Sequence, residues 1–565
     1  MRNHRIIATI ILVLFVTPFF SNCTSSQISQ NAGYATPIKA ENTLTSFPSP
    51  TVTWTPQPSS TVTPQSPSLW IPPYLPAGFV KSLKLPNNLQ LAEGSNQANL
   101  RLDISPVAPI STWVYALVAP FPTIPDKVSW FDLHSLWNGQ LSDQSPVREL
   151  LVNENTRDVL EKLWGTSSSR TIRVVSADNL LDQAWKTRSS WAIIPFEDLQ
   201  PRWKVIAIEG NSPIHKDFSP EGYPLSVPIS LLGDQDLANL LLSHQQQESS
   251  SALAPKSNLD AGLLTTVILT GVTALVRATA GLMQLKGITY PGEDIRDWLS
   301  EADITHISNE IPFTPKCPPP YPRQDVLVFC SQPKYIGLLE DIGTDVVELS
   351  GDHFQDWGPD AMLYTIDLYK KLGWKYYGGG VNLEDGRKPA IFEHNGNRLA
   401  FLGCNAKPPG YAGATATSPG AVHCNFDVLV TEIRNLLSAG YLPIVTFQHL
   451  EYYDYKASPF LIPDFRKVAE AGAVIVSGSQ AHQPQAMEFD GNSFLHYGLG
   501  NLFFDQYNEG LPERQAFIDR HIFYNGSYIS TEILTIQFID LARPRPMTAE
   551  ERRQLLDIIF KASGW

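Results

Sequence analysis

From Thr265 onward, the sequence repeats one unit, an apolar segment followed by a loop and an amphipathic helix. Such alternation predicts short buried strands in a largely parallel sheet, covered by helices on both faces. The dipeptides Asn395-Gly396 and Asp490-Gly491 are typical of tight hairpin turns, so an antiparallel portion is expected as well. The expected strands are TTVILTG, ITHIS, TDVVELS, LPIVTF and AVIVSG, and the expected helices are GEDIRDWLSEA, PKYIGLLEDIG, DAMLYTIDLYKKLG, FDVLVTEIRNLLSAG and PDFRKVAEAG. The fold class is therefore predicted to be layered α/β.

A smaller domain is expected before this one, because 565 residues exceed what one hydrophobic core usually holds. Residues 69–242 combine strand-like runs, such as TWVYALVAPF and RTIRVVSA, with the helix-like run SPVRELLVNENTRDVLEKLWG. This mixture predicts another α/β domain. The polar stretch 243–258 is interpreted as a linker, which places the main domain at 259–545 and a C-terminal helix at 546–565.

Parts of the smaller domain resemble the type II periplasmic solute-binding fold. The resemblance rests on APFPTIPDKVSWFDLHSLWNG, SSWAIIPFEDLQPRWKVIAIEGNSP and EGYPLSVPISLL. No residue there commits to a ligand, so two interpretations stay open. One is a structural or protein-binding domain, and the other is a domain that binds a small molecule.

The N-terminus has the pattern of an export signal. Basic residues precede the apolar run Ile6–Phe20, and Cys23 follows shortly after it. Residues 1–22 are therefore expected to be a secretory signal peptide, with an apolar run too short to predict a membrane span. A Cys after the apolar core resembles a bacterial lipobox, which implies diacylation of Cys23 and anchoring on the outer face of the cell membrane. Asn22 departs from the small residue usual there, and the alternative is a plain signal peptide with an incidental Cys.

The segment 23–68 is dominated by Pro, Ser and Thr. It has too few apolar residues to bury a core, so it is expected to be disordered. Proline stiffens such a chain, and the segment is interpreted as an extended tether that holds the folded body away from the membrane.

The cysteines predict disulfides. An even number remains if Cys23 carries lipid, and an exported protein meets an oxidising compartment. Four thiols allow three pairings, and sequence proximity favours Cys317 with Cys330 and Cys404 with Cys424. The alternative is four buried free thiols.

Polar side chains follow the expected strands of the main domain at the points where the strands end. Because the ends of parallel strands converge on one crevice, we expect five strand ends of a single sheet to bring these side chains together. Carboxylate, imidazole and amide groups are what hard and borderline divalent metals accept as ligands. The residues are Asn309, Glu310, Asp352, His353, Asp356, His449, Glu451, Ser479, Gln480, His482, Asn501 and Asp505.

The order and content of these segments resemble the CapA family of the calcineurin-like metallophosphatase superfamily, over about residues 265–505. The matching segments are ISNEIPFT, VVELSGDHFQDWG, TFQHLEYY, VSGSQAHQPQAMEF and HYGLGNLFFD. The resemblance implies a metallophosphatase-like fold and a part in the synthesis of capsule or poly-γ-glutamate. Two positions depart from the family pattern, since Val272 replaces an Asp ligand and Ser479 replaces a His.

The resemblance also implies roles for individual residues. His353, oriented by Asp356, is expected to donate a proton to a leaving group, and Glu451 is expected to act as a base or to orient His449. With two ligands lost, one divalent ion is expected (Mn, Zn, Fe or Mg), or none. The implied metal ligands are Glu310, Asp352, His449 and His482. The implied substrate contacts are Asn309, Arg277, Gln480 and Asn501.

Three functions follow as hypotheses. The first is a surface metallohydrolase that cleaves a phosphoester, amide or glycan-linked bond in a polymer such as poly-γ-glutamate or polysaccharide. The second is an envelope protein that binds such a polymer or a solute without turnover, its degenerate site holding polar residues that bond one another. The third is a scaffold for a polymerase or exporter. The formal net charge of -14, with no basic stripe, argues against nucleic acid and means that an acidic polymer is repelled unless a cation intervenes.

Overall fold

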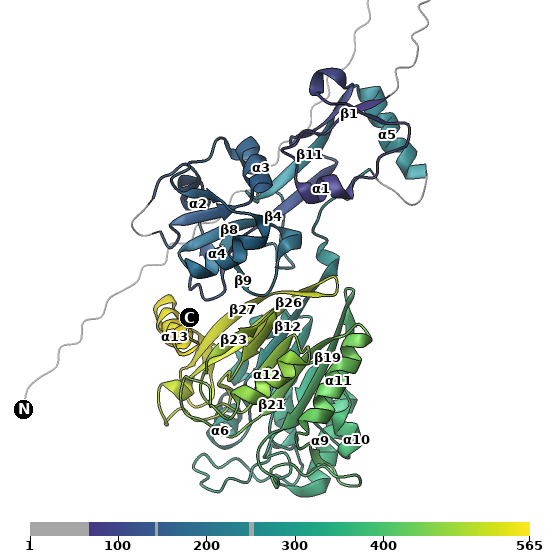
Figure 1. The fold of residues 1–565 in the computed structure, drawn as a ribbon. Helices are drawn as coiled ribbons and strands as arrows, with labels where there is room; N and C mark the ends of the chain where they lie inside the picture. Colours follow the sequence, from purple (N-terminus) through teal and green to yellow (C-terminus); the bar gives the residue numbers. More distant parts are fainter. Residues whose placement is uncertain (1–66, 142–144, 248–252) are drawn as a thin grey trace, which may run out of the picture. The chain divides into compact units, whose positions relative to one another are not determined.

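The computed structural model describes residues 67–141, 145–247 and 253–565, and its fold is drawn in Figure 1. The expected signal peptide, Cys23 and all but the end of the expected tether lie outside these residues. Within the described ranges, no helix combines the length and the apolar character needed to cross a membrane.

A nine-stranded sheet organises the first part of the described chain, with the order β2-β1-β3-β11-β4-β8-β6-β7 and with β9 paired to β4. The strands are β1 (Ser68–Trp70), β2 (Gln90–Leu91), β3 (Leu100–Ile104), β4 (Ser111–Pro120), β6 (Glu149–Val152), β7 (Ile172–Val174), β8 (Ser190–Pro195), β9 (Trp203–Val205) and β11 (Ser226–Gly233), with a separate pair β5 (Lys127–Val128) and β10 (Ala207–Ile208). The helices are α1 (Ala77–Ser82), α2 (Trp130–Trp137), α3 (Glu154–Trp164), α4 (Leu180–Lys186) and α5 (Gln235–Gln247). This is the smaller α/β domain.

The first half of the helix expected at SPVRELLVNENTRDVLEKLWG is a strand instead. β6 lies between β7 and β8 and pairs in parallel with both. Leu150, Leu151 and Val152 are fully buried, so this short apolar run is a central strand, which periodicity alone cannot distinguish from a buried helix. The helix α3 begins only after Asn153, whose side chain accepts a hydrogen bond from the backbone amide of Thr156.

The segment interpreted as a linker is partly built into the structure. Helix α5 extends into it as far as Gln247. At its other end, Asn258 forms two hydrogen bonds with the backbone of Val114 on β4, at 2.7 and 2.8 Å. The last residues of the segment therefore pack along the nine-stranded sheet.

The main domain holds two sheets where one was expected. Sheet one has the order β16-β15-β14-β12-β26-β27-β28, with β13 beside β14 and β25, and sheet two has the order β18-β19-β21-β22-β24-β23. Sheet one contains β12 (Leu264–Thr270), β13 (Val272–Thr273), β14 (Ile304–Asn309), β15 (Val346–Glu348), β16 (Lys375–Tyr377), β25 (Asn501–Phe503), β26 (Gln515–Tyr524), β27 (Ser527–Phe538) and β28 (Pro544–Pro546). Sheet two contains β18 (Ala390–His394), β19 (Asn397–Asn405), β21 (Leu442–Gln448), β22 (Ile475–Gly478), β23 (Met487–Asp490) and β24 (Ser493–His496), and β17 (Gly379–Gly380) pairs with β20 (Gly420–Ala421).

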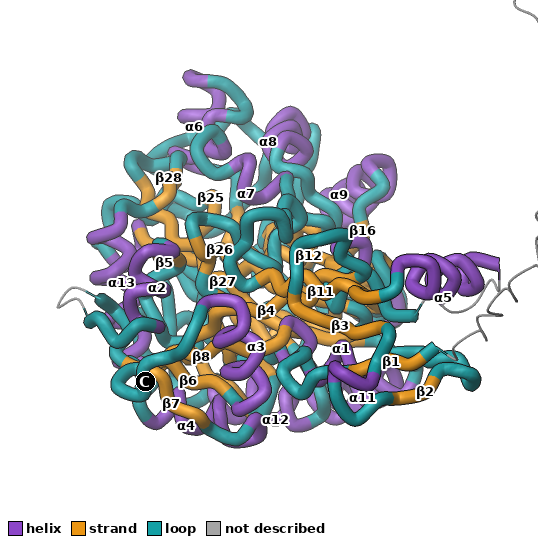
Figure 2. The backbone as a smooth tube through the Cα atoms, turned by 90° about the horizontal axis from the view of Figure 1, so that it is seen from above, coloured by secondary structure: helices purple, strands orange, loops and turns teal. Residues whose placement is uncertain are grey.

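The two sheets face each other across a shared apolar core. Val267 and Val346 of sheet one pack in the same cluster as Phe401 and Ile444 of sheet two. Helices cover the outer faces, so the order of layers is helix, sheet, sheet, helix, with strands shown in orange in Figure 2. The helices of sheet one are α6 (Arg277–Lys286), α7 (Arg296–Ser300), α8 (Ile336–Asp341) and α9 (Gly358–Leu372), and those of sheet two are α11 (Phe426–Ser438) and α12 (Ile462–Glu470). The chain also has α10 (Leu383–Arg387) and, near its end, α13 (Ala549–Ala562).

Each sheet combines parallel strands with an antiparallel portion, as expected. In sheet one β12, β14, β15 and β16 are parallel, and β26 runs antiparallel to β12. In sheet two β19, β21, β22 and β24 are parallel. The two expected hairpins are closed by turns at Asn395-Gly396 and Gly491-Asn492, the second one residue later than expected. The parallel strands of both sheets deliver their carboxyl ends to the candidate site.

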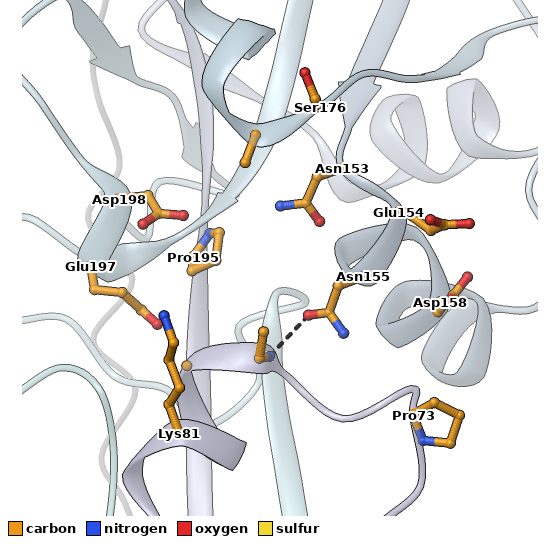
Figure 3. A pocket seen from close by; sticks show the side chains of 13 residues that line it. Pro73, Lys81, Asn153, Glu154, Asn155, Asp158, Ser176, Pro195, Glu197 and Asp198 are labelled. Atoms are coloured by element: carbon orange, nitrogen blue, oxygen red, sulfur yellow. Dashed lines mark hydrogen bonds between the residues drawn. The ribbon is translucent and has the colours of Figure 1, made fainter.

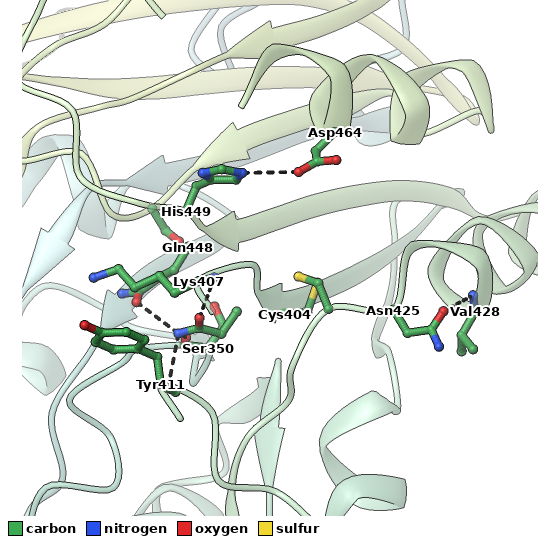
Figure 4. The surroundings of a disulfide bond; sticks show 12 residues. Ser350, Cys404, Lys407, Tyr411, Asn425, Val428, Gln448, His449 and Asp464 are labelled. Atoms are coloured by element: carbon green, nitrogen blue, oxygen red, sulfur yellow. Dashed lines mark hydrogen bonds and ion pairs between the residues drawn. A yellow bond between two sulfur atoms is a disulfide. The ribbon is translucent and has the colours of Figure 1, made fainter. Parts of the chain in front are cut away.

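The structure contains the two disulfides that sequence proximity favours. Cys317 is bonded to Cys330, and Cys404 is bonded to Cys424. The second of these ties the end of β19 to the loop after β20, beside the loop that carries Lys407 and Tyr411 (Figure 4).

Candidate functional site

The strand ends of sheet one lie in direct contact. Glu310 follows β14, and Gly351 and Asp352 follow β15. A Cβ atom placed on Gly351 would overlap the backbone of Glu310, so only glycine allows the two loops to approach this closely. The contact sets Glu310 beside Asp352 and His353.

Gln448 joins these loops to sheet two. Its side-chain oxygen accepts a hydrogen bond from the backbone amide of Asp352 at 2.9 Å, and its amide nitrogen donates to Glu310 at 3.3 Å. Gln448 was not among the expected site residues. The alternation of side chains along β21 could have predicted its place in the site. Phe447 packs on the helix-covered face of β21, so the next side chain, that of Gln448, points to the opposite face, toward sheet one.

His449, an expected metal ligand, is not brought to this group. Its Nε2 lies 3.2 Å from Asp464 Oδ2 on α12, and its Nδ1 accepts a hydrogen bond from the backbone amide of Leu450 (Figure 4). The physical reason is again alternation, which turns His449 to the opposite side from Gln448. Glu451 therefore does not orient His449, since Asp464 does.

A buried lysine stands among the acidic side chains. Lys407 Nζ lies 2.6 Å from Asp352 Oδ2 and 3.5 Å from Glu451 Oε1, and the residue is 4 % exposed. Burial alone would lower the pKa of the ammonium, but Asp352 and Glu451 more than offset this and hold the pKa of Lys407 above its usual value. The second oxygen of Asp352, Oδ1, is buried and has no hydrogen-bond partner among the described residues.

His353 and Asp356 form the expected pair. His353 Nδ1 lies 2.8 Å from Asp356 Oδ2, which also accepts a hydrogen bond from the backbone amide of Phe329. Burial acts to lower the pKa of His353, but Asp356, Glu310 and Asp352 prevail and raise this pKa to about 9. The imidazole is therefore protonated at neutral pH. Burial, followed by the charge of Asp352, raises the pKa of Glu310.

The fourth expected ligand, His482, is hydrogen-bonded to Asn501 through its Nδ1 and its backbone carbonyl oxygen. The two residues exchange hydrogen bonds, from His482 Nδ1 to Asn501 Oδ1 at 2.8 Å and from Asn501 Nδ2 to the carbonyl oxygen of His482 at 3.0 Å. Burial lowers the pKa of His482. Gln480 donates to Glu451 Oε1 at 3.2 Å and thereby holds that carboxylate at the rim, where its side chain is 39 % exposed.

Two of the expected substrate contacts are structural in this geometry. Asn309 is fully buried and donates to the carbonyl oxygen of Ile311 and to Tyr369 Oη. Arg277 Nε donates a hydrogen bond to Asp505 at 2.8 Å. The backbone of Arg277 has φ +44°, in the left-handed region that residues other than glycine rarely adopt. The guanidinium stacks over Phe504.

The comparisons with known proteins bear on this arrangement. The profile of the family described as bacterial capsule synthesis protein PGA_cap matches residues 243–506, which includes both parallel sheet centres. The capsule biosynthesis protein CapA of Bacillus anthracis is 25 % identical over 339 residues, which are 58 % of this chain and 82 % of that protein. Residues 243–506 of the chain are similar to the CapA family. The PGA biosynthesis protein CapA of Bacillus subtilis (strain 168) is 24 % identical over 223 residues, 39 % of this chain and 57 % of that protein.

Solved structures are more distant from this chain. NAD nucleotidase of Haemophilus influenzae has a TM-score of 0.31 and 9 % identity, covering 53 % of this chain and 56 % of that one. An ABC-type phosphate transport receptor from Vibrio cholerae has a TM-score of 0.25 and 15 % identity, covering 29 % of this chain and 84 % of that one. At such scores, the fold assignment rests on the sheets themselves.

The side chains present do not fit the metal ion that the CapA resemblance implied. Val272 is buried without a donor atom, and Ser479 donates to the buried Glu348 instead of facing the site. Over the ranges that the structure describes, no three His, Cys, Asp or Glu side chains form a group able to hold a metal ion. A divalent ion at Asp352 would in addition lie against the ammonium of Lys407, where like charges repel.

A separate hollow lies in the smaller domain (Figure 3). The cavity has a volume of about 790 Å³ and lies between α1, the start of α3 and the ends of β7 and β8. Glu154, Asp158, Glu197 and Asp198 line it together with Lys81. Burial is the main cause that raises the pKa values of Glu197 and Asp198.

Proposed function

We propose that this chain acts at the cell surface in making or processing an anionic polymer, such as poly-γ-glutamate or an acidic polysaccharide. The names of its Bacillus relatives, which refer to capsule and PGA biosynthesis, support the polymer class. Export, the lipid anchor at Cys23 and the tether 23–68 belong to the same proposal. They rest on the sequence patterns.

The pairing of His353 with Asp356 carries the chemical part of the proposal. Asp356 accepts a hydrogen bond from Nδ1 and so fixes the orientation of the ring, which leaves the Nε2 proton of the protonated imidazole for a substrate. A protonated ring held in place is what general acid catalysis of bond cleavage needs. Its side chain is 19 % exposed, so a small reacting group can reach it.

The reaction that fits is hydrolysis of an amide or phosphoester bond. A water oxygen forms a bond to the carbonyl carbon or to phosphorus, and the carboxylate of Glu451 takes the proton of that water. As the bond to the leaving nitrogen or oxygen breaks, His353 gives that atom its Nε2 proton. The products are an acid and an amine or alcohol, and no redox partner is required. Tyr453 and Gln480 donate hydrogen bonds to Glu451 and orient it.

The proposed hydrolysis is tested by measuring the chain length of the polymer. The full mature protein is incubated with poly-γ-glutamate and, separately, with an acidic polysaccharide whose units are joined by phosphodiester bonds, and chain length is followed by gel filtration. We expect the wild type to shorten one of them and His353→Asn to do so at least about 100-fold more slowly. The matched control His423→Asn, at an exposed histidine, should match the wild type. Binding without shortening would favour the non-catalytic alternative, and neither binding nor shortening would remove the polymer proposal.

A second function is favoured by the cavity of the smaller domain. Its volume of about 790 Å³ falls in the range of small-molecule sites, which supports solute binding over a purely structural role. Four carboxylates against Lys81 favour a polar solute with amino groups over an anion. Calorimetric titration with lysine, spermidine and phosphate tests this, with Asp198→Asn as the cavity variant and Asp217→Asn as the control. Binding of phosphate alone, or of none of the three, would contradict it.

A further inference from the structure

The side chain of Lys407 connects a loop of sheet two to a loop of sheet one. The residue lies in the loop after β19 of sheet two, where its backbone amide donates to Asn405 Oδ1 at 2.9 Å and fixes the start of that loop. Its ammonium reaches Asp352 of sheet one at 2.6 Å. The ring of Tyr411 lies 5.3 Å from Nζ and adds a favourable contact with the cation. The side chain is thus fixed from several directions.

The position of the ammonium is informative because of what surrounds it. Asp352, Glu451 and Glu310 all act on the charge of Lys407, and two of these three residues are buried. Buried carboxylates must be neutralised by a cation or by protons. In this site the chain itself supplies the cation, 2.6 Å from the carboxylate that would otherwise be the first to bind a metal ion.

We propose that Lys407 is the built-in cation of the site and takes the place of a divalent metal ion there. The remaining departures agree with this role. Val272 and Ser479 offer the site no ligand, and His449 is held by Asp464 on the other side of β21. The ammonium neutralises Asp352 and places a permanent positive charge beside His353 and Glu310, which a metal ion would otherwise supply.

Loss of the Lys407 ammonium should raise the affinity of the site for divalent metal ions. Removing the ammonium frees both oxygens of Asp352, of which Oδ1 already has no partner among the described residues, and leaves Glu310 and Glu451 without their cation. A site that repels divalent ions in the wild type should then attract them. Lys407→Arg keeps the positive charge and should keep the ions out.

Equilibrium dialysis with Mn²⁺ tests the proposal on the full mature protein, without polymer. We expect Lys407→Ala to bind Mn²⁺ at least about tenfold more tightly than the wild type, a difference of about 1.4 kcal/mol. Lys407→Arg should behave as the wild type. The matched control is Lys204→Ala, because Lys204 is also buried and lies 2.7 Å from a carboxylate, that of Asp126, outside the site. A wild type that binds one Mn²⁺ per chain as tightly as Lys407→Ala would overturn the proposal.

A second measurement decides the matter if Lys407→Ala does not fold. The melting temperature of the wild type is recorded in EDTA and in excess Mn²⁺, since a ligand that binds the folded state raises it. We expect no difference, and an increase with Mn²⁺ would overturn the proposal. The inference depends on the proposed function only for the location of the site, so a failure to shorten polymer and a failure here are separate results.

Discussion

His353 Nδ1 lies 2.8 Å from Asp356 Oδ2, one turn further along the loop that leaves β15. The same carboxylate oxygen is held by the backbone amide of Phe329, so Asp356 is fixed before it fixes the imidazole. The pair is the part of the expected site that the fold assembles most completely, and most of its chemistry follows from the pKa of His353.

Replacing Asp356 should lower the pKa of His353 from about 9 toward the ordinary value near 6.5, because a charged hydrogen-bond acceptor is lost. NMR titration of the ring nitrogens in Asp356→Asn measures this, with Asp360→Asn, an exposed residue nearby, as control. If the titration midpoint of His353 stays at the wild-type value, Asp356 does not raise the pKa of this histidine.

The same pair predicts a pH dependence of stability. The folded-state pKa of His353 is raised above its unfolded value, so the stabilisation is complete below about pH 6.5 and is lost as the pH rises through about 9. Urea unfolding of wild type and Asp356→Asn should therefore differ more at pH 6 than at pH 10. Equal differences at both values would contradict the assignment.

Gly351→Ala should disturb the site by moving its two loops apart. The added methyl group would overlap the backbone of Glu310, and relief of such a clash costs about 1–3 kcal/mol of unfolding free energy. Shortening of polymer should fall with it, because Asp352 and His353 move with the loop. Gly94→Ala is the control, since a Cβ there meets no atom within 4 Å. Similar effects of both substitutions would argue against the close approach.

Gln448 and His449 offer a comparison of neighbours. Gln448→Leu leaves the amide of Asp352 and the carboxyl of Glu310 without their shared partner, at a cost of about 1–3 kcal/mol. Polymer shortening should drop sharply. His449→Leu breaks only the contact with Asp464 and should retain most activity. A larger loss of activity in His449→Leu than in Gln448→Leu would show that His449, and not Gln448, belongs to the site.

Local patterns predicted the elements of the main domain well. The expected runs such as ITHIS and LPIVTF are the strands β14 and β21, and both glycine turns close hairpins. Strand alternation and burial look the same whether parallel strands belong to one sheet or to two that face each other, which is why a single sheet was expected. In the smaller domain, the run at β6 was assigned to a helix because a short apolar segment fits both periods.

The site was predictable where a motif residue sits directly after a strand and unpredictable where geometry decides between neighbours. His353 and Asp356 are three residues apart in one loop, so their contact is local. Whether Gln448 or His449 points into the site depends on the register of β21. A shift of one residue would exchange the faces on which the two side chains lie. Lys407 reaches Asp352 from 55 positions away in a different sheet, and no local pattern connects them.

The rate at which the wild type shortens polymer, measured with and without EDTA, tests most directly whether the site works by proton transfer beside Lys407 and without a metal ion. We expect the rate to be the same in both conditions and His353→Asn to lower it in both. A rate that vanishes in EDTA and returns with added Mn²⁺, or an absence of shortening in either condition, would contradict this expectation.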